Sequence, residues 1–309
     1  MPRRSVIALA AAGALASTGT ACVGARNLLI GQAIRARSAI PKAWDVPPRA
    51  DGVYTPGGGP AQRWRRGMPA DLHLMVFGDS TATGYGCRAA DEVPGVLIAR
   101  GLAEQTGKRV RLSTKAIVGA TSKGLSGQVD AMFVAGPPPD AAVIMIGAND
   151  ITALNGIGAS ARRLGAAVRR LRSSGAVVVV GTCPDFGVIT AIPQPLRWLA
   201  RTRGLRLARA QAAAVRAAGG VPVPLADLLA PQFRHAPERL LSDDRYHPSA
   251  AGYALAADQL LPALCHALGQ PTSGLVAELP GRQRLGIVSR LWRRSATGVP
   301  APLVAPAGG

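Results

Sequence analysis

The chain has 309 residues, of which 48% are apolar, 17% charged and only 4% aromatic, a composition that suits one domain with a large buried core and excludes disorder over the whole length. Only one stretch, near the N-terminus, approaches the roughly 20 apolar residues that a bilayer span needs, which excludes a multi-pass membrane protein. The net charge is +19, but the arginines are not interleaved with aromatic side chains, and those between residues 162 and 172 fall on the predicted solvent face of a helix. We therefore expect no nucleic-acid partner, while attraction to an acidic envelope or membrane surface stays an alternative.

The first 26 residues have the features of an export signal. Two arginines near the start are followed by a small and apolar run to about Val23, and Gly19 and Ala21 form a cleavage site before Cys22. We expect residues 1–26 to be a signal peptide or, if uncut, a membrane anchor. Lipidation of Cys22 is a weaker alternative, because Gly19 stands where lipoprotein signals carry Leu. The protein is thus expected to be exported, and either secreted or tethered to the cell envelope.

Periodicity divides the rest of the chain into three parts. Residues 27–70 contain Pro and Gly clusters without a sustained period, which indicates a linker and surface wrap. Strands are predicted over residues 72–77, 110–117, 141–146, 176–181 and 221–225. Helices are predicted over residues 94–104, 122–133, 160–172 and 196–218, with a last helix from residue 248. This alternation predicts an α/β domain over residues 71–270 with a doubly wound parallel sheet, and the basic, Pro/Gly-rich residues 271–309 are expected to be a disordered tail.

Polar residues and glycines follow several of these strands, where ligands bind in sheets of this kind. The sequences are Gly78-Asp79-Ser80, Gly119, Gly147-Ala148-Asn149-Asp150 and, before the last helix, Asp244-Arg245-Tyr246-His247. Each alone has an ordinary structural explanation, because Ser and Asn often cap helices and Gly supplies tight turns. Together they provide a hydroxyl nucleophile, a base with a carboxylate to orient it, and donors for an oxyanion. The combination therefore indicates acyl transfer.

These four blocks, in this order, resemble the SGNH (GDSL) hydrolase family over about residues 71–268, and the chain looks like an exported GDSL-type esterase of the mycobacterial kind. The resemblance implies a three-layer α/β/α fold with a flavodoxin-like, five-stranded parallel sheet. From the chemistry we expect Ser80, His247 and Asp244 to be nucleophile, base and orienting carboxylate. The expected oxyanion donors are the N–H groups of Ser80 and Gly119 and the side-chain amide of Asn149.

The sequence argues against the rival α/β-hydrolase fold. That fold requires G-x-S-x-G, but Ala82 replaces the last Gly, and its triad Asp lies far from its His, whereas Asp244 lies only three residues before His247. The first block also carries Thr81 and Ala82 where many family members have Leu and a small residue, so substrate approach near Ser80 is expected to differ.

Other candidate residues receive weaker roles. His73, which opens a strand, and His235, which lies in a Pro-flanked loop, are both expected at the surface. Asp79 and Asp150 are expected to brace loops around the site. An apolar segment after the fourth strand is an acyl-binding wall or lid, or else part of the core: Asp185, Phe186, Val188, Ile189, Ile192, Leu196 and Trp198. The four cysteines, Cys22, Cys87, Cys183 and Cys265, have no metal spacing, so we expect no metal or cofactor, and at most one disulfide if Cys22 is removed.

The leading hypothesis is a serine esterase that hydrolyses short- to medium-chain carboxylic esters. Its substrate is expected to be a small-molecule, lipid or glycan ester. Alternatives are a carbohydrate or peptidoglycan O-acetylesterase, a lysophospholipase, and an acyltransferase that uses the same triad. A catalytically silent envelope-binding protein is the alternative from another class. The alcohol part of the substrate and the oligomeric state stay open.

Overall fold

The computed structural model describes residues 23–38 and 47–270. The predicted tail and most of the predicted signal segment lie outside these residues. Residues 23–26 of that segment belong to a helix that continues to residue 38. None of the helices in the described part of the chain is long and apolar enough to cross a bilayer.

A single six-stranded sheet forms the centre of the domain. Its strands are β1 (Gly52–Tyr54), β2 (Leu72–Gly78), β3 (Val110–Thr114), β4 (Ala141–Met145), β5 (Val177–Gly181) and β6 (Val221–Val223), in the order β1-β3-β2-β4-β5-β6. Strands β2 to β6 are parallel, as predicted. Their order is that of flavodoxin-like folds, with the switch of chain direction between β2 and β4.

The sixth strand corrects the five-stranded expectation and the interpretation of residues 27–70 as a linker. Strand β1 pairs antiparallel with β3, from Gly52 opposite Leu112 to Tyr54 opposite Val110. Val53 and Tyr54 are buried, and the Tyr54 hydroxyl donates to the Ala50 carbonyl at 2.6 Å. A three-residue strand is too short to show a period in the sequence, although it covers the edge of β3.

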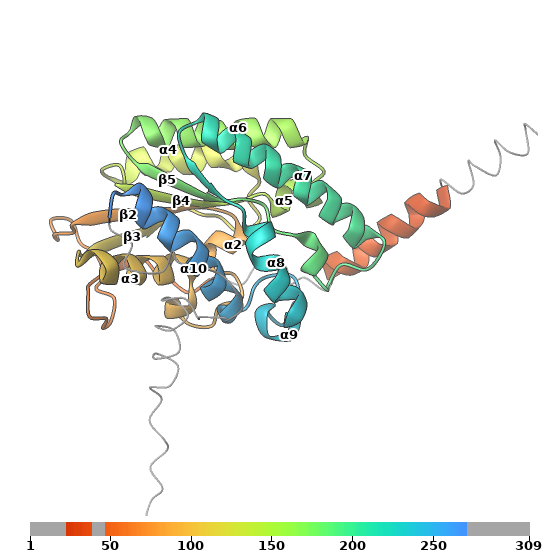
Figure 1. Cartoon of the computed structure of the whole chain (residues 1–309), viewed down its shortest axis with the longest axis horizontal. Helices are drawn as coiled ribbons and strands as arrows, with labels where there is room; N and C mark the ends of the chain where they lie inside the picture. Colours follow the sequence, from red (N-terminus) through yellow and green to blue (C-terminus); the bar gives the residue numbers. More distant parts are fainter. Residues whose placement is uncertain (1–22, 39–46, 271–309) are drawn as a thin grey trace, which may run out of the picture.

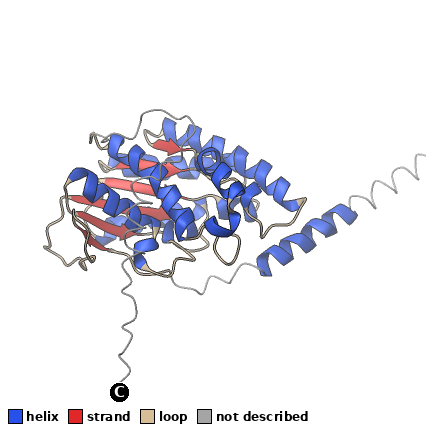
Figure 2. Cartoon of the chain, turned by 60° about the horizontal axis from the view of Figure 1, so that its bottom comes forward, coloured by secondary structure: helices blue, strands red, loops and turns tan. Residues whose placement is uncertain are grey.

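Helices cover both faces of the sheet (Figures 1 and 2). They are α2 (Ser80–Thr83), α3 (Pro94–Thr106), α4 (Leu125–Ala135), α5 (Ala148–Thr152), α6 (Ile157–Ser173), α7 (Leu196–Ala217), α8 (Leu225–His235), α9 (Pro237–Leu240) and α10 (Ala250–Ala267), with 3₁₀ turns η1 (Ala90–Glu92), η2 (Ser122–Gly124) and η3 (Phe186–Val188). Helices α3 and α10 pack with Leu74 and Val76 of β2, whereas α4 and α6 pack with Met75 and Phe77. This alternation is the period of a strand buried on both faces.

Helices α8 and α9 replace part of the loop that was expected before the last helix. The predicted strand at residues 221–225 ends at Val223, and α8 begins at Leu225. His235 is therefore the last residue of α8, and it is exposed as expected. His73, in contrast, is buried, and its Nε2 lies 2.9 Å from Ser113 Oγ, so its expected surface position was wrong.

Candidate active site

Ser80 lies at the carboxyl end of β2, as the first residue of α2. The turn that presents it depends on Gly78, whose φ is +138° and whose Cβ, if present, would lie 1.9 Å from the Met145 carbonyl oxygen. The side chain of Gln128 holds this glycine on both sides, since Oε1 accepts from the Gly78 N–H at 2.9 Å and Nε2 donates to the Gly78 carbonyl at 2.8 Å. The position of Ser80 is thus fixed by contacts that no other residue type at position 78 would allow.

His247 and Asp244 come from a closed loop just before α10. Backbone pairing between Leu241 and Pro248, and a 2.9 Å bond from the Ser242 N–H to the His247 carbonyl, close this loop. The structure places His247 Nε2 3.0 Å from Ser80 Oγ and His247 Nδ1 2.6 Å from Asp244 Oδ2. The three side chains thus form one hydrogen-bonded chain.

The carboxylate of Asp244 is held by several donors besides the imidazole. Its Oδ1 accepts from the Ser242 hydroxyl at 2.7 Å and from the N–H groups of Tyr246 and His247 at 2.8 and 2.9 Å. Burial disfavours the ionised form, but the hydrogen bonds from His247 and Ser242 outweigh it and lower the pKa of Asp244 to about 2. Asp244 is therefore ionised at any pH near neutrality and can balance a charged imidazole.

Two tyrosines surround the imidazole. The ring centroid of Tyr85 lies 4.5 Å from that of His247, and the Tyr246 ring meets it edge-on at 5.0 Å. Tyr253 supports this arrangement, because its hydroxyl donates to the Tyr85 carbonyl at 2.8 Å. Sequence reasoning missed Tyr85 because nothing in a single sequence relates it to a histidine 162 positions later.

Gly119 and Asn149 lie at the ends of the two strands that flank β2. Gly119 is exposed and has a φ of +80° in the turn that the Ala120 N–H closes on the Ile117 carbonyl at 3.0 Å, a position in which a type II turn requires Gly. Asn149, in α5, donates one amide hydrogen to the Ala120 carbonyl at 3.0 Å. An amide nitrogen carries two hydrogens, so the second is available to an oxyanion.

Asp150 joins these two segments, in line with its expected bracing role. Its Oδ1 accepts from the hydroxyls of Ser122 and Ser160 at 2.7 and 2.8 Å and from the Asn155 amide at 3.0 Å. Its Oδ2 accepts from the Ser122 N–H at 2.8 Å. The carboxylate therefore ties the loop after β3 to α5 and α6.

Asp79 has a different environment, although it also braces a turn. Its Oδ1 caps α2 by accepting from the Thr81 N–H at 3.0 Å, while Oδ2 is buried with no partner among the described residues. Burial raises the pKa of Asp79 to about 6, against the lowering effect of the bond from Thr81.

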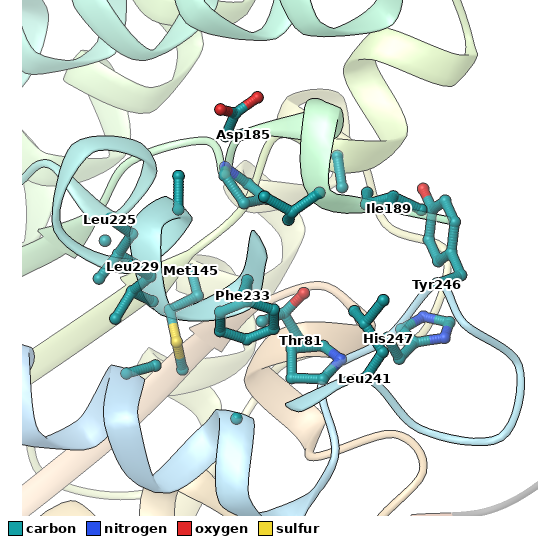
Figure 3. Close-up of a pocket in the computed structure, with 18 of the residues that line it drawn as sticks. Thr81, Met145, Asp185, Ile189, Leu225, Leu229, Phe233, Leu241, Tyr246 and His247 are labelled. Carbon is teal, nitrogen blue, oxygen red and sulfur yellow. The ribbon is translucent and has the colours of Figure 1, made fainter. Parts of the chain in front are cut away.

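A small cavity of about 80 Å³ opens beside His247 and Thr81 (Figure 3). Its lining is mostly apolar and comes from the ends of β4 and β5, from η3, and from α8 and α10, including Met145, Ile146, Val188, Ile189, Leu229 and Phe233. Of the predicted wall residues, Asp185, Val188 and Ile189 line the cavity. Ile192 is buried in the same apolar cluster as Ile189 but does not line the cavity, and Trp198 is exposed, so the segment combines wall and packing roles.

The cavity wall after β5, formed by Asp185, Val188 and Ile189, is held against two helices by ion pairs of Asp185. The Asp185 side chain is only 2% exposed. It forms ion pairs with Arg201 of α7 at 3.1 Å and with Arg234 of α8 at 2.6 Å. No motif in the sequence marks Arg201 or Arg234 as partners of Asp185. Near the same wall, Cys183 is buried, and Cys87, Cys183 and Cys265 are all free thiols.

The assembled groups can perform nucleophilic acyl transfer. A hydroxyl contacts a histidine that contacts an ionised carboxylate, and the Gly119 and Asn149 segments follow the two strands that adjoin β2. Asp243, the neighbour of Asp244, does not take part. Its side chain is 97% exposed and pairs with Arg88 at 3.2 Å.

Comparisons with known proteins agree with this chemistry. Residues 76–255 match the GDSL-like Lipase/Acylhydrolase family. The chain is 73% identical, over 97% of its length and 99% of the relative's, to the GDSL-like esterase Rv1075c of Mycobacterium tuberculosis. The psychrotrophic esterase EstA of Pseudoalteromonas sp. has the same fold, with a TM-score of 0.51 at 19% identity over 65% of this chain and 100% of that one. A lipase/acylhydrolase of Enterococcus faecalis gives a TM-score of 0.49 at 24% identity, over 66% and 100%.

Proposed function

Because the chain belongs to the GDSL-like lipase/acylhydrolase family and is a carboxylic ester hydrolase, we propose that Ser80 is its nucleophile, His247 its general base and Asp244 the carboxylate that orients the imidazole. The observation that supports this most directly is the chain of contacts, 3.0 Å from Ser80 Oγ to His247 Nε2 and 2.6 Å from His247 Nδ1 to Asp244 Oδ2. Both distances lie within hydrogen-bond reach, as proton transfer requires.

In the proposed reaction Ser80 Oγ attacks the ester carbonyl carbon while His247 Nε2 accepts its proton. The negative oxygen of the tetrahedral intermediate is stabilised by the N–H groups of Ser80 and Gly119 and by the amide of Asn149. His247 then gives its proton to the departing alcohol, which leaves an acyl group on Ser80. Water, activated by the same imidazole, releases the acid and restores the enzyme.

The nucleophile can be tested by covalent labelling. A fluorophosphonate should label the wild-type protein at Ser80 and should fail to label Ser80→Ala. Circular dichroism of the variant checks that it is folded. Absence of labelling in the folded wild-type protein would instead support a catalytically silent binding protein.

We propose that the acyl part is short to medium in length. The support is the size of the cavity, about 80 Å³, and its apolar lining beside His247. Additional methylene groups raise kcat/KM only if they are buried, by about 0.8 kcal/mol each. On p-nitrophenyl esters from acetate to palmitate, kcat/KM should therefore peak at or below about eight acyl carbons. A peak at acetate would favour an O-acetylesterase, and a peak at palmitate would contradict the proposal.

We also propose that the protein is exported and stays free or attached at the cell envelope. The support is the sequence of residues 1–26, with its basic start and apolar run. Fractionation of cells that express the full chain, with N-terminal sequencing of the product, tests this proposal. Recovery of uncleaved protein only from the cytoplasmic fraction would contradict it.

A further inference from the structure

The helix over residues 23–38 buries one side and leaves large apolar groups exposed on another. Gln32 and Ala36 face the domain and are buried, whereas Val23, Ile30 and Ile34 are 57%, 44% and 62% exposed. The spacings of seven and four residues place these three apolar side chains along one stripe of the helix. Leaving such a stripe in water is unfavourable, which indicates a binding partner.

The buried side fixes this helix next to the cavity wall. Gln32 donates to the Gln194 carbonyl and accepts from the Leu196 N–H at 3.0 Å. Ala36 belongs to the apolar cluster that contains Ala148 and Ile189, two residues that line the cavity. The other end of the helix projects away from the domain in both views (Figures 1 and 2).

The first turns of α7 carry further exposed apolar side chains. Trp198 and Leu199 come shortly after Gln194 and Leu196, which hold Gln32, and their side chains are 59% and 39% exposed. A tryptophan beside aliphatic and basic residues is typical of helices that lie at the surface of a membrane.

The positive charge of this surface favours an anionic lipid surface over a second copy of the chain as its partner. Helix 23–38 carries Arg26, Arg35 and Arg37, the first turns of α7 carry Arg197, Arg201 and Arg203, and neither segment has a carboxylate; of these arginines, Arg201 is paired with Asp185. A second copy of this chain would bring like charges together, which is unfavourable. An anionic lipid surface would attract them.

We propose that helix 23–38 and the first turns of α7 form a docking surface for an anionic lipid bilayer. The apolar run of the sequence that precedes residue 23 leads directly into this helix, so the start of the helix would lie at the membrane if that run were embedded. Docking brings the cavity wall at Ile189 close to the lipid surface. This proposal goes beyond the ester chemistry, which does not depend on it.

The test uses the fluorescence of Trp198 in the full chain. Vesicles of equal parts phosphatidylglycerol and brominated phosphatidylcholine should quench a component of the tryptophan emission that is missing from Trp198→Phe. Vesicles of brominated phosphatidylcholine alone should quench it much less. A protein attached only through residues 1–22 would float with the vesicles without this quenching.

Substitutions in helix 23–38, compared with control substitutions elsewhere, test whether this helix is the part that contacts the lipid. Ile30→Glu/Ile34→Glu should lose the quenching, whereas Phe133→Glu, at a 50% exposed position on α4, should keep it. Arg35→Gln/Arg37→Gln should weaken it, whereas Arg65→Gln/Arg66→Gln should not. All four should hydrolyse p-nitrophenyl acetate at the wild-type rate, so a failure of the esterase proposal is seen separately.

Three results would overturn the docking proposal. The first is quenching that persists in Ile30→Glu/Ile34→Glu. The second is flotation of the wild-type protein with no quenching of Trp198. The third is a dimer, seen by light scattering, that the same double variant dissociates, since the stripe would then be covered by a second copy.

Discussion

Two adjacent carboxylates, Asp243 and Asp244, have opposite surroundings. Asp244 is buried and accepts hydrogen bonds from His247, Ser242 and Tyr246, whereas Asp243 is in solvent with Arg88 as its only ion-pair partner among the described residues. An exposed pair of this kind contributes little free energy. The difference of one position therefore separates a residue of the proposed triad from a surface residue.

Substituting each carboxylate gives a direct test of this difference. Asp244→Asn should fold but lose roughly a thousandfold or more in kcat, because an amide cannot balance the imidazolium that forms during attack. Asp243→Asn should stay within a few-fold of the wild type. Steady-state rates of both variants, with circular dichroism as the check on folding, decide the matter. An inactive Asp243→Asn beside an active Asp244→Asn would refute the assignment.

The proposed oxyanion donor Asn149 should show a graded effect. Asn149→Ala should lose about a hundred- to a thousandfold in kcat with little change in KM, as expected when one such donor is removed. Asn149→Asp should be no better, because a carboxylate repels the developing negative charge. Near wild-type kcat in either variant would remove Asn149 from the site. Because Asn149 also donates to the Ala120 carbonyl, thermal unfolding of both variants is measured alongside.

At the scale of elements, the site depends on segments from different strands meeting at one edge of the sheet. The Gly119 turn follows β3, Ser80 follows β2 and Asn149 follows β4, so no local sequence signal sets their separation. Asp150 provides a fixed link, since it accepts two bonds from Ser122 and one from Ser160. The relative position of the two proposed oxyanion segments therefore depends on a buried carboxylate outside the proposed triad.

Removal of this link should affect both stability and rate. Asp150→Ala should lower the free energy of unfolding by about 2–4 kcal/mol, because it leaves buried donors without an acceptor, and it should also lower kcat. Ser160→Ala, which deletes a single bond on the α6 side, should cost about 1 kcal/mol and leave kcat unchanged. Urea unfolding and kinetics on the same preparations make the comparison. Equal kcat in wild type and Asp150→Ala would show that Asp150 is purely structural.

At the scale of the whole molecule, the hydrophobic pattern of the sequence predicts the central strands, but it does not predict elements whose position depends on distant contacts. The five parallel strands were predicted because continuous apolar runs such as residues 141–146 and 176–181 leave few alternatives. Strand β1 and helix 23–38 were missed because their positions depend on tertiary contacts, with Leu112 and with Gln194. The residues of the four sequence blocks that form the candidate site could be predicted from the sequence. The side chains that hold them in place could not, because they lie far away in the chain: Gln128 holds Gly78, and Tyr85 contacts His247.

The stability of the whole domain should depend on pH through Asp79. Its pKa is raised from an ordinary value of 3.8 to about 6 by burial, so the folded state holds this proton more tightly than the unfolded state does. The folded state is then favoured most at low pH and loses this contribution as the pH rises from about 4 to about 6, by at most about 3 kcal/mol. Asp244, whose pKa is lowered to about 2, acts in the opposite sense but only below about pH 4.

Asp79→Asn removes the titrating group and keeps an oxygen that can accept from the Thr81 N–H. The free energy of unfolding of this variant, relative to the wild type, should therefore increase between pH 4 and pH 8, by an amount on the order of 2–3 kcal/mol. Urea denaturation at several pH values measures this difference, with Asp243→Asn as the control at an exposed carboxylate. If the free energy of unfolding changed with pH in the same way for Asp79→Asn and the wild type, the pKa of Asp79 would be the same in the folded and unfolded states. Its buried Oδ2 would then have a hydrogen-bond partner in solution that offsets the cost of burial.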